Sequence, residues 1–131
     1  MGIRKRSFAC SALVTATLAS MVGCYEGNPS DPIVCTAQFV YGLNVTVRDQ
    51  STGLPQADDA TLTLREGSYE EIVTDSWDGS TLSGAGERAG TYGVVVEHAG
   101  YQMWTRDGVA ITADECHVIP VSLTADLVPV P

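Results

Sequence analysis

Residues 45–55 read Val45-Thr46-Val47-Arg48-Asp49-Gln50-Ser51-Thr52-Gly53-Leu54-Pro55, and residues 60–64 read Ala60-Thr61-Leu62-Thr63-Leu64. Over 45–48 and over 60–64, apolar and polar side chains alternate with a period of two, as in a β-strand that buries one face. Gly53 and Pro55 lie between the runs, and both are turn residues, because glycine accepts a positive φ and proline ends a strand. The two runs therefore predict two strands joined by a turn.

Short alternating runs continue to the end of the chain. Turn residues separate them at intervals of roughly ten residues, and no window has the 3.6-residue period of an amphipathic helix. The expected strands are 37–48, 60–66, 69–75, 80–86, 90–98, 101–111 and 117–124. Strands of this length and spacing indicate an all-β, antiparallel sandwich. We place this domain at 33–127 and a proline-rich tail at 128–131.

The order of these motifs resembles that of carboxypeptidase regulatory-like domains. In those domains a strand, an Asp, a Thr-Gly turn and a Pro-containing loop precede a strand of the form Ala-x-Leu-x-Leu, as in 45–64 here. The later motifs also match: Ala89-Gly90-Thr91-Tyr92-Gly93-Val94-Val95-Val96, Gly100-Tyr101 and Val109-Ala110-Ile111. The resemblance implies a seven-stranded transthyretin-like, immunoglobulin-like β-sandwich. Residues 76–90 depart from the pattern, so their strand pairing stays open.

Two details of the fold follow from single residues. Gly53 and Gly100 stand where tight reversals favour a positive φ. Tyr92 alternates with Val94 and Val96, so we expect its ring in the core. Its hydroxyl group is then expected to bond to a backbone group at the rim, as in the tyrosine corner of other sandwiches.

The first 23 residues have the features of an export signal. The basic residues 4–6 precede an apolar run over 8–22, which is short for a bilayer span. The sequence Met21-Val22-Gly23-Cys24 resembles a bacterial lipobox. That resemblance implies cleavage after Gly23, a diacylglyceryl group on the Cys24 sulfur and acylation of the new amino terminus. A plain secretory signal and an uncleaved anchor helix are the alternatives.

Acyl chains on Cys24 are expected to hold the protein in a lipid bilayer. Residues 24–32 contain two prolines and one glycine without apolar periodicity, so we interpret them as a lipidated tether. Tyr25 is not the aspartate that, in the usual sorting pattern, retains a lipoprotein at the inner membrane. The expected location is the outer membrane of a Gram-negative bacterium.

The charge of the chain limits its partners. The formal net charge is −9, from 7 basic and 16 acidic side chains. Residues 1–23 contain three of the basic residues and no acidic one, so the chain from Cys24 onward has 4 basic and 16 acidic side chains and a net charge of −12. Such a surface excludes nucleic acid as a partner and is repelled by anionic lipid headgroups. The oligomeric state stays open.

Two cysteines remain for the folded domain. Cys35 precedes the first strand and Cys116 precedes the last. Because an exported protein is exposed to oxidising conditions, we expect a disulfide between Cys35 and Cys116. A reactive or metal-binding pair is the alternative.

No catalytic motif is present, and the chain lacks the metallocarboxypeptidase domain that such modules accompany in some proteins. There is no Gly-x-Ser-x-Gly and no P-loop, and no His-x-x-His or Cys-x-x-Cys supports a metal site. We therefore expect no enzyme and no cofactor. Calcium is the alternative, with oxygen ligands from Asp75 and Asp78 or from Asp58 and Asp59.

Trp77 is the residue that most suggests a contact site. It lies in a predicted loop between Asp75 and Asp78, and a glycine-rich run follows at 84–86. Loops on a rigid sandwich are common recognition sites, although Trp77 could instead plug the end of the core. We expect Trp104, on a strand, in the core. These observations predict a non-catalytic envelope lipoprotein that contacts a protein or a glycan. The alternatives are a calcium-dependent adhesion module and an accessory subunit of an envelope hydrolase or transport system.

Overall fold

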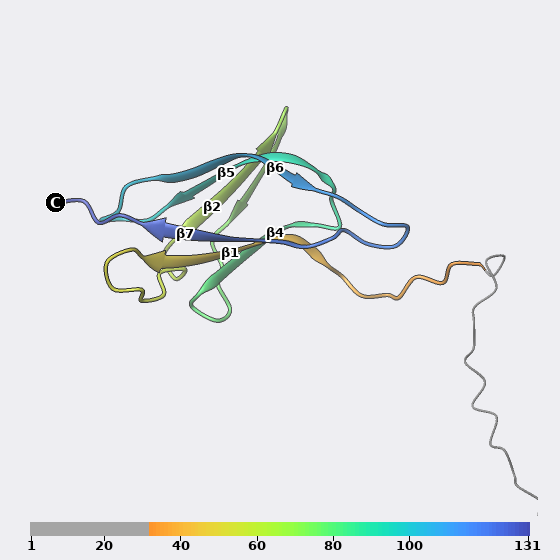
Figure 1. Cartoon of the computed structure of the whole chain (residues 1–131), viewed down its shortest axis with the longest axis horizontal. Coiled ribbons are helices and arrows are strands. Elements are labelled where there is room, and N and C mark those ends of the chain that lie inside the picture. The colour runs from red at the N-terminus through yellow and green to blue at the C-terminus, as the bar shows by residue number, and fades with distance from the viewer. Residues whose placement is uncertain (1–31) are drawn as a thin grey trace, which may run out of the picture. The chain divides into compact units, whose positions relative to one another are not determined.

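The computed structural model describes residues 32–131. Over this range the chain contains seven strands and no helix, so the predicted all-β class is confirmed. Figure 1 shows how the strands are arranged. The strands are β1 (Tyr41–Asp49), β2 (Thr61–Glu66), β3 (Tyr69–Val73), β4 (Thr81–Gly86), β5 (Gly90–Glu97), β6 (Trp104–Ile111) and β7 (Val121–Leu127). No membrane-spanning helix occurs in these residues. The predicted signal peptide, Cys24 and nearly all of the tether lie outside them.

The strands form two sheets that pack face to face around one core (Figure 1). One sheet has the order β4-β1-β7 and the other the order β3-β2-β5-β6. β1 and β7 run parallel, from Leu43↔Val121 to Asp49↔Leu127, whereas the other neighbours are antiparallel. The prediction of a purely antiparallel sandwich is therefore wrong at this pair. Alternation of apolar and polar residues is the same for both strand directions, so it could not reveal the parallel pair.

β1 and β7 begin later than predicted because of the residues that precede them. The amide of Val40 donates to the Glu87 carboxylate (2.8 Å) and not to a neighbouring strand, so β1 begins at Tyr41 rather than at residue 37. Pro120 has no amide, and β7 runs over 121–127 rather than 117–124. The bounds of β2, β3, β4 and β5 agree with the predicted ones to within two residues.

The proline-rich tail belongs to the folded unit, which spans 33–131. The amide of Gln102 donates to the carbonyl of Val128 (2.8 Å), and the amide of Val130 donates to the carbonyl of Gly100 (2.9 Å). Because residues 100–102 pair with the tail, β6 begins at Trp104 rather than at residue 101. The tail thereby links the end of β7 to the other sheet.

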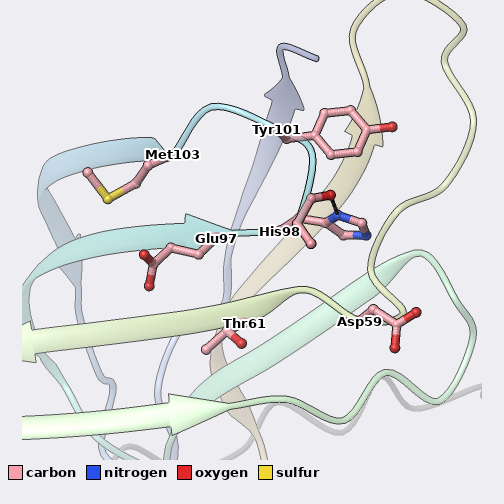
Figure 2. A pocket seen from close by; sticks show the side chains of 7 residues that line it. Asp59, Thr61, Glu97, His98, Tyr101 and Met103 are labelled. Atoms are coloured by element: carbon pink, nitrogen blue, oxygen red, sulfur yellow. Dashed lines mark hydrogen bonds between the residues drawn. The ribbon is translucent and has the colours of Figure 1, made fainter. Parts of the chain in front are cut away.

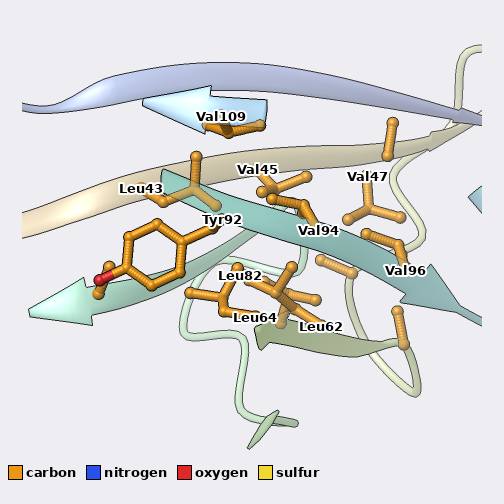
Figure 3. Packing of buried hydrophobic residues seen from close by; sticks show 14 of the residues in the cluster. Leu43, Val45, Val47, Leu62, Leu64, Leu82, Tyr92, Val94, Val96 and Val109 are labelled. Atoms are coloured by element: carbon orange, nitrogen blue, oxygen red, sulfur yellow. The ribbon is translucent and has the colours of Figure 1, made fainter. Parts of the chain in front are cut away.

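The core lies between the two sheets, and Figure 3 shows the side chains of β5 among those of its neighbours. The alternating residues named in the prediction point inward. The larger core residues with no exposed surface include Leu43, Val45, Val47, Leu62, Leu64, Leu82, Tyr92, Val94 and Val96. Gly53 and Gly100 have φ values of 71° and 84°, as their turn positions predict.

Tyr92 confirms the tyrosine-corner prediction. Its side chain is completely buried, and its hydroxyl group donates to the carbonyl of Arg88 (3.1 Å). The guanidinium group of Arg88 donates to the same hydroxyl oxygen (2.5 Å) and to the Glu66 carboxylate (2.6 Å). It also lies over the ring of Tyr69, 3.9 Å from the centroid. This network joins the β2–β3 hairpin to the turn before β5.

Cys35 and Cys116 form the predicted disulfide. The neighbouring His117 lies with Nδ1 2.9 Å from the Glu87 carboxylate and Nε2 3.2 Å from the hydroxyl oxygen of Thr36. Together these contacts join the segment that leads into β1 to the segment that precedes β7.

Candidate contact groove

Trp77 lies in the loop between β3 and β4, and a turn holds it away from the core. The Oδ1 atom of Asp78 accepts hydrogen bonds from the amides of Ser80 (2.9 Å) and Thr81 (2.8 Å). These amide bonds hold the pKa of the Asp78 carboxyl below its usual range. Gly79 supplies a φ of 71° that completes the turn. The side chain of Trp77 is left 90% exposed, so it does not plug the end of the sandwich.

The exposed indole borders a groove of about 290 Å³. The groove is lined by Tyr41 from β1, Ile72 and Val73 from β3, Asp75 and Trp77 from the loop, and Ser83 from β4. Ile72 is 60% exposed and Tyr41 46% exposed. The ring of Phe39, also exposed, meets that of Tyr41 edge to face at 5.1 Å. Four large apolar side chains are thus exposed on this side of the domain.

The two strands that flank the groove are both sheet edges, but their backbones differ. β4 ends one sheet and β3 ends the other. The amide of Ala85 on β4 donates to the Glu71 carboxylate (2.9 Å), and the amide of Thr81 donates to Asp78. Side chains therefore occupy outward-facing amides of β4. Among residues 32–131, no side chain bonds to the backbone of β3, whose single neighbouring strand is β2.

The groove is acidic. Glu71 and Asp75 both line it, and the part of the chain that the structure describes provides no ion pair for either. The Glu71 carboxylate accepts hydrogen bonds from the Tyr69 hydroxyl group (2.9 Å) and from the Ala85 amide, so it is held in place at the groove wall. The adjacent Glu70, by contrast, is paired with Arg65 at 2.6 Å.

The three residues predicted as a contact site separate into two roles. Trp77 and Asp75 line the same groove, whereas Asp78 does not line it and caps the turn. Sequence reasoning missed Tyr41 and Ile72. Ile72 did carry a signal, since in the alternation of β3 it falls, with Glu70, on the outward face. Tyr41 carried none, because it is distant from the loop in sequence.

Trp104 has a different environment from Trp77. It was expected in the core, and it is partly buried and packs against the core without being one of its buried residues. The guanidinium group of Arg106 lies 5.9 Å from its ring centroid.

A second hollow, of about 420 Å³, lies where β2 begins, β5 ends and the chain approaches β6. Figure 2 shows its labelled side chains spread around it and not converging on one point. The His98 side chain contacts residues close to it in the chain. Its Nδ1 atom lies 2.7 Å from the carbonyl oxygen of Ala99, and its ring meets that of Tyr101 edge to face at 5.0 Å. Asp59 lines the hollow, and its partner in the calcium alternative, Asp58, lies beside Gly79. Within 32–131, no three His, Cys, Asp or Glu side chains are grouped to hold a metal ion.

No protein-family model matches this sequence, and no curated protein is significantly similar to it.

Proposed function

We propose that the protein is a non-catalytic lipoprotein of the bacterial cell envelope that binds an envelope protein or glycan through the groove between β3 and β4. The observation that carries the proposal is the exposure of Trp77 beside Ile72 and Tyr41. Large apolar side chains gathered on a surface typically mark an interaction site, because their burial in a contact removes apolar area from water. Tryptophan and tyrosine are also enriched where binding energy is concentrated.

The polar groups of the groove fit this role. Asp75 and Glu71 provide acceptors, and Ser83 provides a hydroxyl group that is already oriented by a bond to the Asn44 side chain (2.7 Å). A rigid pocket with apolar walls and a few placed polar groups is the usual form of a recognition site.

The membrane attachment and the finer fold type are parts of the same proposal. Cys24 is taken as the acylated residue, on the lipobox resemblance, and residues 25–32 as the tether to the domain. The carboxypeptidase regulatory-like type is supported by the seven strands, the buried Tyr92 and the glycine turns at 53 and 100. Mass spectrometry of the purified N-terminus tests the anchor: a free, unmodified Cys24 thiol in the mature protein contradicts it.

Binding to envelope fractions tests the groove. The mature lipoprotein, in an uncharged detergent, is sedimented with purified peptidoglycan sacculi and, separately, cross-linked to solubilised envelope proteins. Trp77→Ala is expected to lose most of the binding to one fraction. Met103→Ala is the matched control, since Met103 is 61% exposed and lies outside the groove, so its binding is expected to be unchanged. Equal binding by the two variants contradicts the proposal.

A further inference from the structure

We infer that the groove binds a basic, extended segment of a partner protein, which adds as a strand to the free edge of β3 and places a lysine or arginine over Trp77. This inference rests on the proposed function and names the class of ligand. Three independent features carry it: the open edge of β3, the exposed apolar side chains of Ile72 and Trp77 at the groove, and the unpaired negative charge of the groove.

The open edge selects a strand-like ligand. An edge strand presents unpaired backbone amides and carbonyls, and an extended peptide satisfies them by adding to the sheet. β3 lies at the end of its sheet and its last residues form one wall of the groove. The facing edge strand, β4, is a poorer template, because the amides of Thr81 and Ala85 are occupied by Asp78 and Glu71. The ligand strand is therefore directed to β3.

The apolar side chains favour a ligand with alternating character. Side chains of an added strand point alternately to its two faces, so every second one lies on the same side. Ile72 and Trp77 lie at the groove and remain exposed. An apolar residue of the ligand can cover Ile72, and the stem of a long basic side chain can lie along the indole, with its charge over the ring face.

The charge selects a basic ligand. Of the four arginines after Cys24, three are already paired: Arg48 with Asp126, Arg65 with Glu70 and Arg88 with Glu66. Glu71 and Asp75 have no cationic partner among residues 32–131. The chain from Cys24 onward has a net charge of −12, which attracts a cationic segment before contact.

The same charge argues against a second copy of this chain as the ligand. If two β3 strands paired about their centre, Glu71 of one copy would lie opposite Glu71 of the other. Like charges directly opposite one another destabilise a strand pair. The two copies would also repel each other as bodies of net charge −12. The acidic edge therefore discourages self-pairing and is complementary to a basic partner.

Three synthetic octapeptides with blocked ends test the inference. One alternates Lys and Val, the second alternates Glu and Val, and the third alternates Lys and Pro. The Lys-Pro peptide keeps the positive charge, but each proline removes an amide and fixes φ at about −65°, far from the extended value of an antiparallel strand, so a continuous strand ladder is strongly disfavoured. Binding to the mature lipoprotein is measured by isothermal titration and by Trp77 fluorescence in a Trp104→Phe background. We expect the Lys-Val peptide to bind at least about ten-fold more tightly than either of the others.

Two pairs of variants locate the site. Trp77→Ala is expected to weaken Lys-Val binding at least about ten-fold, and Met103→Ala to leave it unchanged. Asp75→Asn is expected to weaken it more than Asp107→Asn, which removes the same charge from an exposed position outside the groove. Unfolding curves for all four variants show whether a loss of binding is a loss of fold.

Each other outcome overturns the inference in a distinguishable way. Equal binding of the Lys-Pro and Lys-Val peptides shows attraction by charge without strand addition. No binding of the Lys-Val peptide, with Trp77-dependent binding of chitohexaose or of sacculi, removes the peptide ligand and leaves the proposed function as glycan binding. If no peptide, glycan or envelope fraction depends on Trp77, the inference and the proposed function both fail.

Discussion

Two loops of this protein have the same local sequence and opposite surroundings. Asp49 is followed by Ser51 and Thr52, and Asp78 by Ser80 and Thr81. In both loops the aspartate Oδ1 atom accepts hydrogen bonds from the amides two and three residues later. The carboxylate of Asp49, however, is buried and also accepts the hydroxyl group of Tyr101 (2.8 Å). Asp78 is exposed and follows a tryptophan that is exposed too.

The difference shows how one turn motif serves two purposes. At Asp49 the turn closes one end of the sandwich, and its carboxylate is shared between the turn and the segment before β6. At Asp78 the same two bonds join the loop to the first residue of β4, and the preceding Trp77 stays exposed to water. The first turn is therefore expected to matter for stability, and the second for contact with a ligand. The following experiments test that division.

The largest effect on stability is expected from loss of the Cys35–Cys116 disulfide. Cys35 and Cys116 are separated by 81 residues, and the entropy of closing a loop of that length corresponds to about 4 kcal/mol. The Cys35→Ser/Cys116→Ser double variant is expected to lose roughly that much free energy of unfolding, measured by urea titration. A loss below about 1 kcal/mol would mean that other contacts, such as those of His117, already hold the two segments together.

The next effect is expected at the tyrosine corner. Tyr92→Phe keeps the buried ring but removes the hydroxyl group that bonds to Arg88. Loss of these bonds between the buried hydroxyl group and the partly buried Arg88 is expected to lower the free energy of unfolding by about 1–2 kcal/mol. Tyr41→Phe makes the same chemical change on a half-exposed ring and is expected to have no measurable effect. Equal losses in the two variants would contradict a stabilising role for the Tyr92 hydroxyl group.

The two aspartates can be compared directly by pH. Hydrogen bonds from Ser51, Thr52 and Tyr101 hold the pKa of Asp49 far below its usual range. A carboxyl whose pKa is lower in the folded state stabilises the fold above its unfolded pKa of about 3.9, and this contribution is lost as pH falls below that value. Asp49→Asn is therefore expected to destabilise the protein at pH 7 and to differ progressively less from wild type as pH falls from about 5 to 2.

Asp78→Asn provides the control for that experiment. The pKa of Asp78 is also lowered, by the amides of Ser80 and Thr81, and within residues 32–131 no side chain from another part of the chain bonds to its carboxylate. The sign of the pH dependence is expected to be the same and its size smaller. The measurement is an acid titration followed by circular dichroism. A larger effect on stability for Asp78→Asn than for Asp49→Asn would contradict the expected difference between the two turns.

Much of the two-sheet core could be predicted from the sequence, because the signals for its strands are local. The period-two runs placed β2 and β5 nearly to the residue, and Tyr92 was predicted in the core with its hydroxyl group bonded to the backbone. The disulfide was predicted from the expected export to an oxidising compartment and from the two cysteines that remain in the domain. The parallel pairing of β1 and β7 could not be predicted this way, since strand direction leaves no mark on the alternation.

The groove was less predictable because its parts come together only in the folded chain. Trp77 and Asp75 were identified from one loop, but Tyr41 and Ser83 come from other strands. The repeated Asp-x-Ser-Thr motif could not show which copy is buried. That depends on Tyr101, which lies 52 residues from Asp49 in the chain.

The smallest effect on stability is expected where the effect on binding is largest. Trp77 is 90% exposed, so Trp77→Ala removes few contacts and is expected to change the free energy of unfolding by less than about 0.5 kcal/mol. A buried tryptophan would instead lose about 3–5 kcal/mol. Iodide quenching of Trp77 in a Trp104→Phe background measures its exposure independently, and we expect quenching close to that of free tryptophan. If Trp77 is instead shielded from iodide and its loss unfolds the domain, the indole is part of the core, and both turns stabilise the fold.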